Sequence, residues 1–444
     1  MVVTLDHLAA CFEGIYPSAI ATQSADGTPN ISYLSHVWRI DAHHIALSNQ
    51  FFAKTAANIR SNPRATVLLV DPHSGVQYHV AVIWQRSADH GPLFKQMTAD
   101  LNATSAQIGM SDVMRLRSVD IFRVENITMV AASDHLPASS QPLLDAAAIA
   151  STTRAIGDIN DPSQLLTTLL DSVREFGFDH AILLLSDTGQ ETLTTVAAIG
   201  YGPGHVGAEV PFGIGLIGGA ARSSQPIRIN DVSRLRRMGG AVIHSSHPED
   251  LHARQIAMPG LSDSLSQIAV PMIVHGKVRG VLFVESAGRL AFDRSAVAGL
   301  EIIASYGAAI LALNQHAEDI VAAAVTQVPA PAAPFERDKI AYLHHATDNS
   351  VFIDHAYVIK GLAGRLLTYM VDQYDSDGRR EFTNRELRLA MADGLPDFKD
   401  NLETRLLLLR RRLEELVLPI RLVRVERGRL RLEVSGRIEI CPRA

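Results

Sequence analysis

Three kinds of hydrophobic pattern follow one another along the chain, and each predicts a different set of secondary-structure elements. In the first third, apolar and polar residues alternate in short runs bounded by turn residues, a pattern that predicts β-strands. These runs lie at residues 18–22, 30–33, 37–40, 65–70 and 121–129. Residues 47–63 predict the end of a strand, a polar turn and a short helical segment that stops at Asn62-Pro63.

The middle of the chain mixes helical and strand periodicities, which predicts an α+β unit. Apolar residues spaced for one helix face predict helices at residues 143–156 and 165–173. Strands are predicted at 180–185, 192–198, 266–274 and 278–286, with a glycine-rich segment at 211–227. A long helix is predicted from Asp293 to about Glu318, and its apolar stripe suits pairing with a second copy of the chain. The stripe consists of Val297, Leu300, Ile303, Ile310 and Leu313.

Helical periodicity dominates the last quarter of the chain. One broad apolar face covers residues 356–373, and Thr383 with Glu386 has the spacing of a capping box that starts a short helix. A third helix is predicted from the apolar stripe Phe398, Leu402, Leu406, Leu409, Leu413 and Leu416. Two alternating strands follow, at 421–426 and 430–434, and Arg427-Gly428-Arg429 joins them. The predicted order is three helices and then a basic hairpin.

Proline-containing segments separate the three patterns and set the domain boundaries. Residues 133–142 predict a linker, and the Pro/Ala-rich residues 325–334 predict a semi-extended tether that cannot continue a helix. The predicted domains are residues 1–134, 140–320 and 336–444, with a linker at 321–335.

Composition narrows the class of protein. Apolar residues make up 47% and charged residues 20%, as in a folded globular chain. No apolar run is expected to reach the roughly 20 residues of a membrane span, and no secretory signal is expected, so we expect a cytoplasmic protein without a membrane partner. Cys11 and Cys441 are the only cysteines, which excludes a disulfide framework, an iron–sulfur cluster and a thiolate zinc finger within one chain.

The segment around residues 47–63 is also the strongest chemical signal. Polar turn atoms beside a helix start form an anion site, because unpaired N–H groups and the helix dipole both favour a phosphate. Together with the strand order, this segment resembles the FMN-binding split β-barrels of the pyridoxamine 5′-phosphate oxidase-like family, which bind FMN at a dimer interface. The resemblance covers roughly the first third of the chain.

The resemblance implies a set of flavin contacts. It assigns the FMN phosphate to Ser48, Lys54, Thr55 and Arg60, the border of the isoalloxazine ring to Ser35, His36 and Trp38, and contacts with the partner subunit's flavin to Gln77 and Tyr78. Two departures leave an alternative open, a barrel that has lost its flavin and serves as a dimerisation scaffold. Residues 80–84 lack a glycine that many members carry, and the phosphate site has fewer arginines.

The middle segment resembles a GAF domain, on its glycine-rich helix start, its Asn230-Asp231-Val232 step and its closing hairpin. GAF domains enclose a small-molecule pocket, so an unidentified ligand is expected. The segment contains no cysteine, which excludes a thioether-bound bilin. His244, His247 and His252 lie in the long predicted loop at 233–264; exposed histidines are favoured over a metal or haem site, and no metal site is predicted.

The C-terminal segment resembles a winged helix of the response-regulator effector type. The resemblance implies a third helix in the DNA major groove and a wing on the backbone. The candidate DNA-binding residues are Lys399, Arg405, Arg412, Arg427 and Arg429. Residues 335–444 carry 20 Lys and Arg against 18 Asp and Glu, a small excess for a DNA-binding module. Contact with protein or RNA therefore remains an alternative.

Taken together, the patterns predict a homodimeric regulator with a β split barrel, an α+β GAF domain and a winged helix-turn-helix. The first two domains would sense a redox state or a small molecule, and the third would carry the output. The alternative is an FMN-dependent oxidoreductase whose GAF and C-terminal domains regulate it. No catalytic residue is assigned for that alternative.

Overall fold

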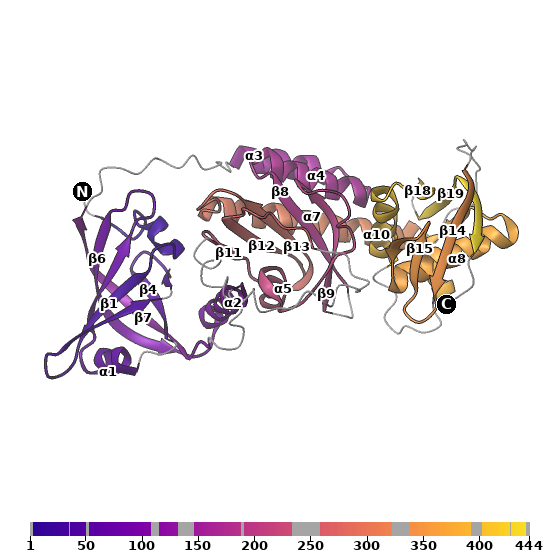
Figure 1. The fold of residues 1–444 in the computed structure, drawn as a ribbon. Helices are drawn as coiled ribbons and strands as arrows, with labels where there is room; N and C mark the ends of the chain where they lie inside the picture. Colours follow the sequence, from indigo (N-terminus) through magenta and orange to yellow (C-terminus); the bar gives the residue numbers. More distant parts are fainter. Residues whose placement is uncertain are drawn as a thin grey trace.

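The structure of the chain is a computed structural model. It describes residues 3–34, 36–49, 53–107, 115–131, 146–187, 191–232, 258–321, 337–391, 402–426 and 428–440. Three folded units follow one another in a row, with the N-terminal unit at one end, the middle unit in the centre and the C-terminal unit at the other end (Figure 1). The N- and C-terminal units each pack against the middle unit.

The N-terminal unit is a seven-stranded antiparallel sheet in the order β2-β1-β5-β6-β7-β4-β3. Its elements are η1 (Ala9–Glu13), β1 (Ser18–Gln23), β2 (Pro29–Leu34), β3 (Val37–Arg39), β4 (His44–Asn49), α1 (Ala53–Ser61), β5 (Arg64–Val70), β6 (Gln77–Ala88), α2 (Pro92–Gln107) and β7 (Ser118–Ala131). Strands occur at each run that the alternation predicts, because one face of each strand is buried against the barrel core. Helix α2 is not among the predicted elements; it lies beside the middle unit (Figure 1).

The middle unit is a six-stranded sheet in the order β10-β9-β8-β13-β12-β11. Its elements are α3 (Ala146–Gly157), α4 (Pro162–Glu175), β8 (His180–Asp187), β9 (Thr192–Ile199), β10 (Glu209–Pro211), α5 (Gly215–Ser223), β11 (Ile227–Ile229), β12 (Ser266–Val274), β13 (Lys277–Ser286) and α7 (Arg294–Val321). Alternate residues of the central strands face opposite ways: Leu183 packs with α4 and α7, and Leu184 packs with α5. The sheet is therefore covered on both faces.

Helix α7 corrects two expectations from the sequence. By length and composition alone, its residues 294–314 would suffice to cross a membrane, with a mean hydropathy of 1.9. In the structure this helix packs on β12 and α3, and 44% of that stretch is buried. Leu300 and Ile303 of the predicted dimer stripe face the core, so that stripe is wrong as a subunit interface. Among the side chains of α7 that the structure describes, the large apolar ones that are exposed are Ile302, Tyr306 and Leu313.

The C-terminal unit combines two small sheets with three helices. Its elements are β14 (Arg337–His345), β15 (Ser350–Ile353), β16 (Ala356–Ile359), α8 (Gly361–Asp377), β17 (Glu381–Thr383), α9 (Asn384–Met391), α10 (Leu402–Glu415), β18 (Ile420–Glu426), β19 (Arg429–Val434) and β20 (Gly436–Ile440). The sheets have the orders β16-β15-β14-β20 and β17-β19-β18. The capping interaction before α9 is present, since the Glu386 N–H donates to Thr383 Oγ1 at 3.2 Å.

Two features of the C-terminal unit differ from the sequence prediction. The predicted helix at 356–373 begins only at Gly361, because residues 356–359 pair with β15 as a strand. The strands β14 and β15 are also additional to the prediction. Asn349, Asp354 and His355 adopt positive φ angles of 54°, 49° and 67°, which close the two tight hairpins that these strands need. Local turn chemistry therefore overrides the helical spacing of the apolar residues.

Helix α10 joins the middle and C-terminal units. It lies between them in Figure 1, and a single cluster of buried apolar residues runs through both units. Four consecutive residues of α10 are buried, Leu406, Leu407, Leu408 and Leu409. A helix that is buried all round is packed on more than one side. Its core-facing stripe was predicted from the sequence and is confirmed by the burial of Leu402, Leu406 and Leu409.

Candidate functional site

The first turn of α1 holds two of the residues assigned to the FMN phosphate. Lys54 is exposed, whereas Thr55 is buried. The Thr55 hydroxyl lies 2.8 Å from Ser32 Oγ and accepts from Asn30 Nδ2 at 3.1 Å. These partners on β2 occupy the hydroxyl, so Thr55 fixes α1 to the sheet. Lys54 and the first N–H groups of the helix fit a phosphate, because neither needs a partner within the helix.

Arg60, assigned to the same phosphate, lies in the last turn of α1. It lies six positions after Lys54, roughly 9 Å along the helix axis. Its guanidinium acts instead on Asp120 of β7, whose carboxylate accepts from Asn49 Nδ2 at 3.2 Å and from the Ser87 hydroxyl. Burial raises the pKa of Asp120, and these partners and Arg60 oppose the shift. The residues assigned to the phosphate therefore fit it only in part: Thr55 and Arg60 are engaged elsewhere, and Lys54 with the first N–H groups of α1 remains.

Three other assigned residues, Ser48, His36 and Trp38, share one face of the sheet. Trp38 is paired with Ala46 across β3 and β4, and the same register places His36 opposite Ser48. This face is covered by α2, whose Met97 packs with Ala46 and Trp38. The structure therefore brings these three residues together on the side of the barrel that faces the middle unit.

The remaining assigned residues of the barrel lie elsewhere. Gln77 is exposed at the start of β6, and Tyr78 packs against the barrel core. Burial raises the pKa of Tyr78, as it raises the pKa of the neighbouring Cys11 thiol to about 12. Ser35 lies outside the described residues. Contact of Gln77 and Tyr78 with a flavin in a partner subunit stays a prediction.

A cavity of about 530 Å³ separates the barrel from the middle unit. We call it the interdomain cavity. The barrel lines it through η1, β3 and α2, and the middle unit lines it through β11 and the start of α7. His36 and Trp38 form part of its wall, with ring centroids 5.2 Å apart. Gly14 permits this placement, because a Cβ there would lie 2.7 Å from His36 Nδ1.

An ion-pair network closes one side of the interdomain cavity. Arg228 of β11 donates to Glu13 of η1 at 2.9 Å and also to the Phe292 carbonyl oxygen. Glu13 accepts a second bond from Asn230 Nδ2 at 2.7 Å. The network ties the barrel to the middle unit across more than 200 residues of sequence. Burial raises the pKa of Glu13, and Arg228 opposes the shift.

Two further titratable groups of the cavity have strongly shifted pKa values. Burial, together with the Arg228 guanidinium, lowers the pKa of His36 to about 4, so this imidazole is neutral at pH 7. Burial raises the pKa of Asp100, on α2, to about 8, although Arg228 opposes the shift. Asp100 is therefore mostly protonated at pH 7. Shifted groups that converge on a cavity mark a candidate binding site.

The residues assigned to DNA binding are less accessible than the sequence predicts. Arg412 is 5% exposed; its Nε donates to the Val358 carbonyl at 3.1 Å, and it pairs with Glu415 at 3.0 Å. The expectation that Arg412 lies on an exposed helix face is therefore wrong, because it fills the junction of α10 and β16. Arg405 is half-buried, and burial lowers its pKa. Arg429 lies 3.8 Å from Glu381, and Lys399 and Arg427 lie outside the described residues.

Helix α10 also binds the middle unit. One carboxylate, that of Glu415, accepts from the N–H groups of Gly204 at 2.6 Å, His205 at 2.9 Å and Val206 at 3.3 Å. Arg411 donates to the Ser163 carbonyl at 2.6 Å. These contacts pair backbone groups of the middle unit with charged side chains of α10.

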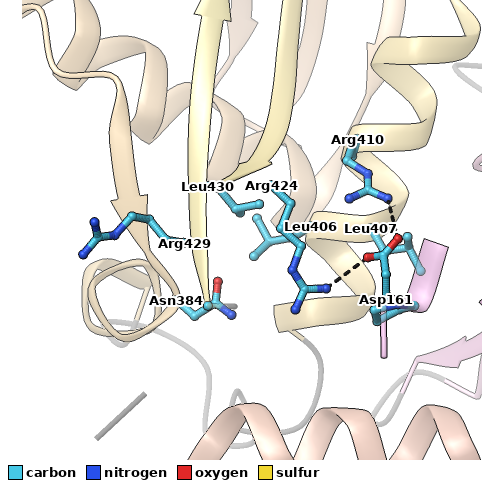
Figure 2. A pocket seen from close by; sticks show the side chains of 10 residues that line it. Asp161, Asn384, Leu406, Leu407, Arg410, Arg424, Arg429 and Leu430 are labelled. Atoms are coloured by element: carbon cyan, nitrogen blue, oxygen red, sulfur yellow. Dashed lines mark hydrogen bonds and ion pairs between the residues drawn. The ribbon is translucent and has the colours of Figure 1, made fainter. Parts of the chain in front are cut away.

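An acidic residue of the middle unit holds two arginines of the C-terminal unit. Figure 2 shows Asp161 between Arg410 and Arg424, at 3.7 Å and 3.0 Å, while Arg429 points away from it. Asp161 also caps α4 by accepting from the Gln164 N–H at 3.1 Å. The hollow beside these side chains holds only about 30 Å³, room for little more than a water molecule. This hollow is part of the interface and is too small for an organic ligand, whereas a second hollow lined by Asp161, Arg410, Glu414 and Arg424 holds about 440 Å³.

Inside the middle unit, the buried carboxylate of Glu285 organises one side of the sheet. It accepts from the Tyr201 hydroxyl at 2.6 Å, the Gln267 amide at 2.8 Å and the Leu261 N–H at 3.0 Å. Its hydrogen-bonding capacity is largely used, which favours a structural role. Among the described residues no group of three metal-binding side chains occurs, and His244, His247 and His252 fall outside those residues.

Comparison with known proteins identifies two of the three units. Residues 4–125 match the family model of pyridoxamine 5′-phosphate oxidase, and residues 160–312 match that of the GAF domain. The N-terminal unit is thus a split barrel of the pyridoxamine 5′-phosphate oxidase-like type, and the middle unit is a GAF domain. Both resemblances predicted from the sequence are confirmed. Neither match extends into the C-terminal unit, whose fold is not identified by the comparisons.

Solved structures resemble the same two units at low identity. An FMN-binding protein from Syntrophomonas wolfei is 17% identical and covers 28% of this chain and 84% of its own, with a TM-score of 0.25. Free methionine-R-sulfoxide reductase from Neisseria meningitidis is 23% identical and covers 41% and 97%, with a TM-score of 0.32. The GAF domain of an Acinetobacter phosphoenolpyruvate-protein phosphotransferase is 19% identical and covers 41% and 96%, with a TM-score of 0.31. No curated protein matches the chain.

Proposed function

We propose that this chain is a regulator in which the split barrel and the GAF domain sense a small molecule and the C-terminal unit carries the output. One observation carries the proposal: α10 of the C-terminal unit is bonded directly to the GAF domain through Glu415 and Arg411. A ligand that shifts the GAF loop at residues 204–206 would act on α10 without an intermediary. Regulation needs an element with two arrangements, and a helix that leaves or rejoins the sensory domain would supply one.

We further propose FMN as the ligand of the barrel, with Lys54 and the N-terminal N–H groups of α1 at its phosphate. When bound, FMN would supply redox chemistry, and the barrel would set access to it. The clustering of Ser48, His36 and Trp38 on one face supports a ring site near β3.

Replacing Lys54 tests the flavin site. Lys54→Ala is expected to weaken FMN binding by about 1.5–3 kcal/mol, roughly ten- to 150-fold, because it removes a charged hydrogen-bond donor. Arg60→Ala is the matched control, since it removes a cation from the other end of the same helix and should leave FMN affinity unchanged. Fluorescence titration with FMN measures both. Equal losses in the two variants would place the phosphate elsewhere, and no binding to the unaltered chain would make the barrel a scaffold.

We propose that the C-terminal unit is a winged helix that contacts DNA. Its order of α8, α9, α10 and the β18–β19 hairpin supports this proposal. In the present arrangement α10 packs on the GAF domain and Arg424 of β18 pairs with Asp161, so we propose that the end of the hairpin that carries Arg429 meets DNA. Arg412 has no place in that contact because it is buried, and the half-buried Arg405 would first have to become accessible.

The salt dependence of DNA binding tests this output. Replacing Arg427 and Arg429 together by alanine is expected to lower the slope of log affinity against log salt by roughly two, one for each lost phosphate contact. Arg437→Ala, an exposed arginine on β20, should leave the slope unchanged. Fluorescence anisotropy with genomic DNA fragments provides the measurement. If the full chain binds DNA with no salt dependence, a protein-contacting C-terminal unit is the better description.

We also propose that the protein is a homodimer in the cytoplasm. Exposed Ile302, Tyr306 and Leu313 on α7, with Ile31 and Tyr33 on the edge strand β2, offer apolar surface for a second copy. Light scattering at micromolar concentration is expected to give twice the chain mass of 48.2 kDa. A monomer mass would remove this proposal.

A further inference from the structure

We propose that the interdomain cavity binds a small organic cation, an aromatic ring that carries a protonated amine. The inference is independent of the DNA proposal, and because His36 and Trp38 line this cavity, it competes with the flavin ring site proposed near β3. It follows from which charges in the cavity already have partners, from the chemistry of its walls, and from its volume.

Two of the three arginines that line the cavity are already neutralised. Arg228 is paired with Glu13 at 2.9 Å, and Arg39 is paired with Asp6 at 2.5 Å. Arg294 is exposed at the start of α7, where solvent screens it. An anionic ligand would have to displace the existing partners of the first two arginines. The cavity therefore offers no unpaired buried cation among the residues that the structure describes.

Two carboxyl groups that line the cavity have no such ion-pair partner. Asp100 of α2 and Glu301 of α7 line it from opposite units, and among the described residues neither carboxyl has an ion pair or a hydrogen bond; the Arg228 guanidinium, which is already paired with Glu13, acts on Asp100 only from a longer distance. A half-buried carboxyl without a partner is stabilised strongly by an entering cation, because little water screens the pair. The cavity therefore favours a positively charged ligand.

The walls of the cavity suit an aromatic ring next to that charge. Phe12 and Trp38 contribute aromatic rings, and Leu93 and Val297 contribute apolar surface. His36, the remaining ring, is neutral at pH 7 and does not repel a cation. Aromatic faces attract ammonium groups through cation–π interaction, and a volume of about 530 Å³ suits a drug-sized molecule. Because the walls come from two units, the ligand would join the barrel to the GAF domain.

Cation binding is expected to expel the proton of Asp100, so affinity should rise with pH. With a pKa of about 8, Asp100 is mostly protonated at pH 6 and half-ionised at pH 8, which makes the apparent affinity about 50-fold higher at pH 8. The charged and titratable groups that face it are Glu13, His36, Arg39, Arg228, Arg294 and Glu301. His36 titrates below this range. Near pH 9 the affinity should stop rising, because Asp100 is then mostly ionised, and at higher pH it should fall as the amine of the ligand loses its proton.

Calorimetric titration of the full chain with two matched probes tests the proposal. Phenethylamine carries a ring and an ammonium group, and 3-phenylpropionate carries the same ring with a carboxylate. We expect phenethylamine to bind at pH 8, and its apparent affinity to rise about 50-fold from pH 6 to pH 8. We expect 3-phenylpropionate to bind at least tenfold more weakly. Binding of neither probe, or tighter binding of 3-phenylpropionate, would overturn the proposal.

Variants of the carboxyl groups locate the site. Asp100→Asn should weaken phenethylamine binding at pH 8 at least tenfold and abolish its pH dependence, and Glu301→Gln should also weaken it. Arg294→Gln is the control, because it removes a positive charge. The affinity for phenethylamine should stay equal or become tighter in this variant. Unchanged affinity in Asp100→Asn, with an unchanged circular dichroism spectrum, would overturn the assignment. If Asp100→Asn fails to fold, proton release by the unaltered chain decides: about one proton per ligand at pH 7 supports the proposal, and none overturns it.

Discussion

Glu415→Ala is expected to detach α10 from the GAF domain, at a cost of about 3 kcal/mol. The carboxylate accepts from three consecutive backbone N–H groups and pairs with Arg412, which is buried. Removing it leaves a buried guanidinium without its ion-pair partner, and breaking a buried pair from one side costs about 3–5 kcal/mol. The amides of residues 204–206 would lose their acceptor at the same time.

Hydrogen exchange measures this effect where it arises. Protection of the Gly204, His205 and Val206 amides should fall about 100-fold in Glu415→Ala, the equivalent of about 3 kcal/mol. Glu414→Ala is the matched control, because Glu414 is exposed and pairs with Arg410 only at 3.7 Å. It should change protection by less than about threefold, as for other exposed ion pairs. Similar loss in both variants would mean that the interface does not depend on the Glu415 carboxylate.

Leu409→Ala is expected to destabilise the middle and C-terminal units together by about 2–5 kcal/mol. Leu409 is fully buried in α10, within the apolar cluster that runs through both units. Truncation to alanine removes the transfer free energy of the side chain and leaves a cavity. Leu389→Ala is the control in the same unit, because Leu389 on α9 is 69% exposed and should cost less than about 0.5 kcal/mol.

Thermal unfolding followed by domain-specific proteolysis separates the two outcomes for Leu409. If α10 belongs to a shared core, the GAF domain and the C-terminal unit lose protection at the same lowered temperature. Destabilisation of the C-terminal unit alone would show that the two units unfold independently. In that case α10 would be free to leave the GAF domain, and the argument for direct coupling would weaken.

The elements of the barrel and of the GAF domain were largely predictable, because each rests on a local regularity. Alternating runs such as 65–70 and 121–129 have one face to bury, so they form strands wherever the partner strands lie. Thr383 and Glu386 start α9 as a capping pair because the bond joins residues three apart. Asp161-Pro162 is a similar helix-start signal, and α4 begins there.

The candidate sites were less predictable, because they join residues that are far apart in the chain. Lys54 was assigned from its place beside a helix start, and it remains available. Thr55 was assigned with it, yet its hydroxyl is taken by Ser32 and Asn30 of another strand. Asp100 gave no signal, since the helix that carries it was not predicted.

The sequence by itself therefore determined the three units, most of their strands and helices, and the families of the first two, because hydrophobic periodicity, turn residues and caps act over a few neighbouring residues. Only the tertiary structure decided which polar side chains are free. The basic stripe of α10 has the same sequence whether it faces solvent or another domain, and its burial depends on Gly204 and Ser163, some 200 residues away. The interdomain cavity has the same cause: η1, α2, β11 and α7 meet only because α2 and η1 pack against the GAF domain.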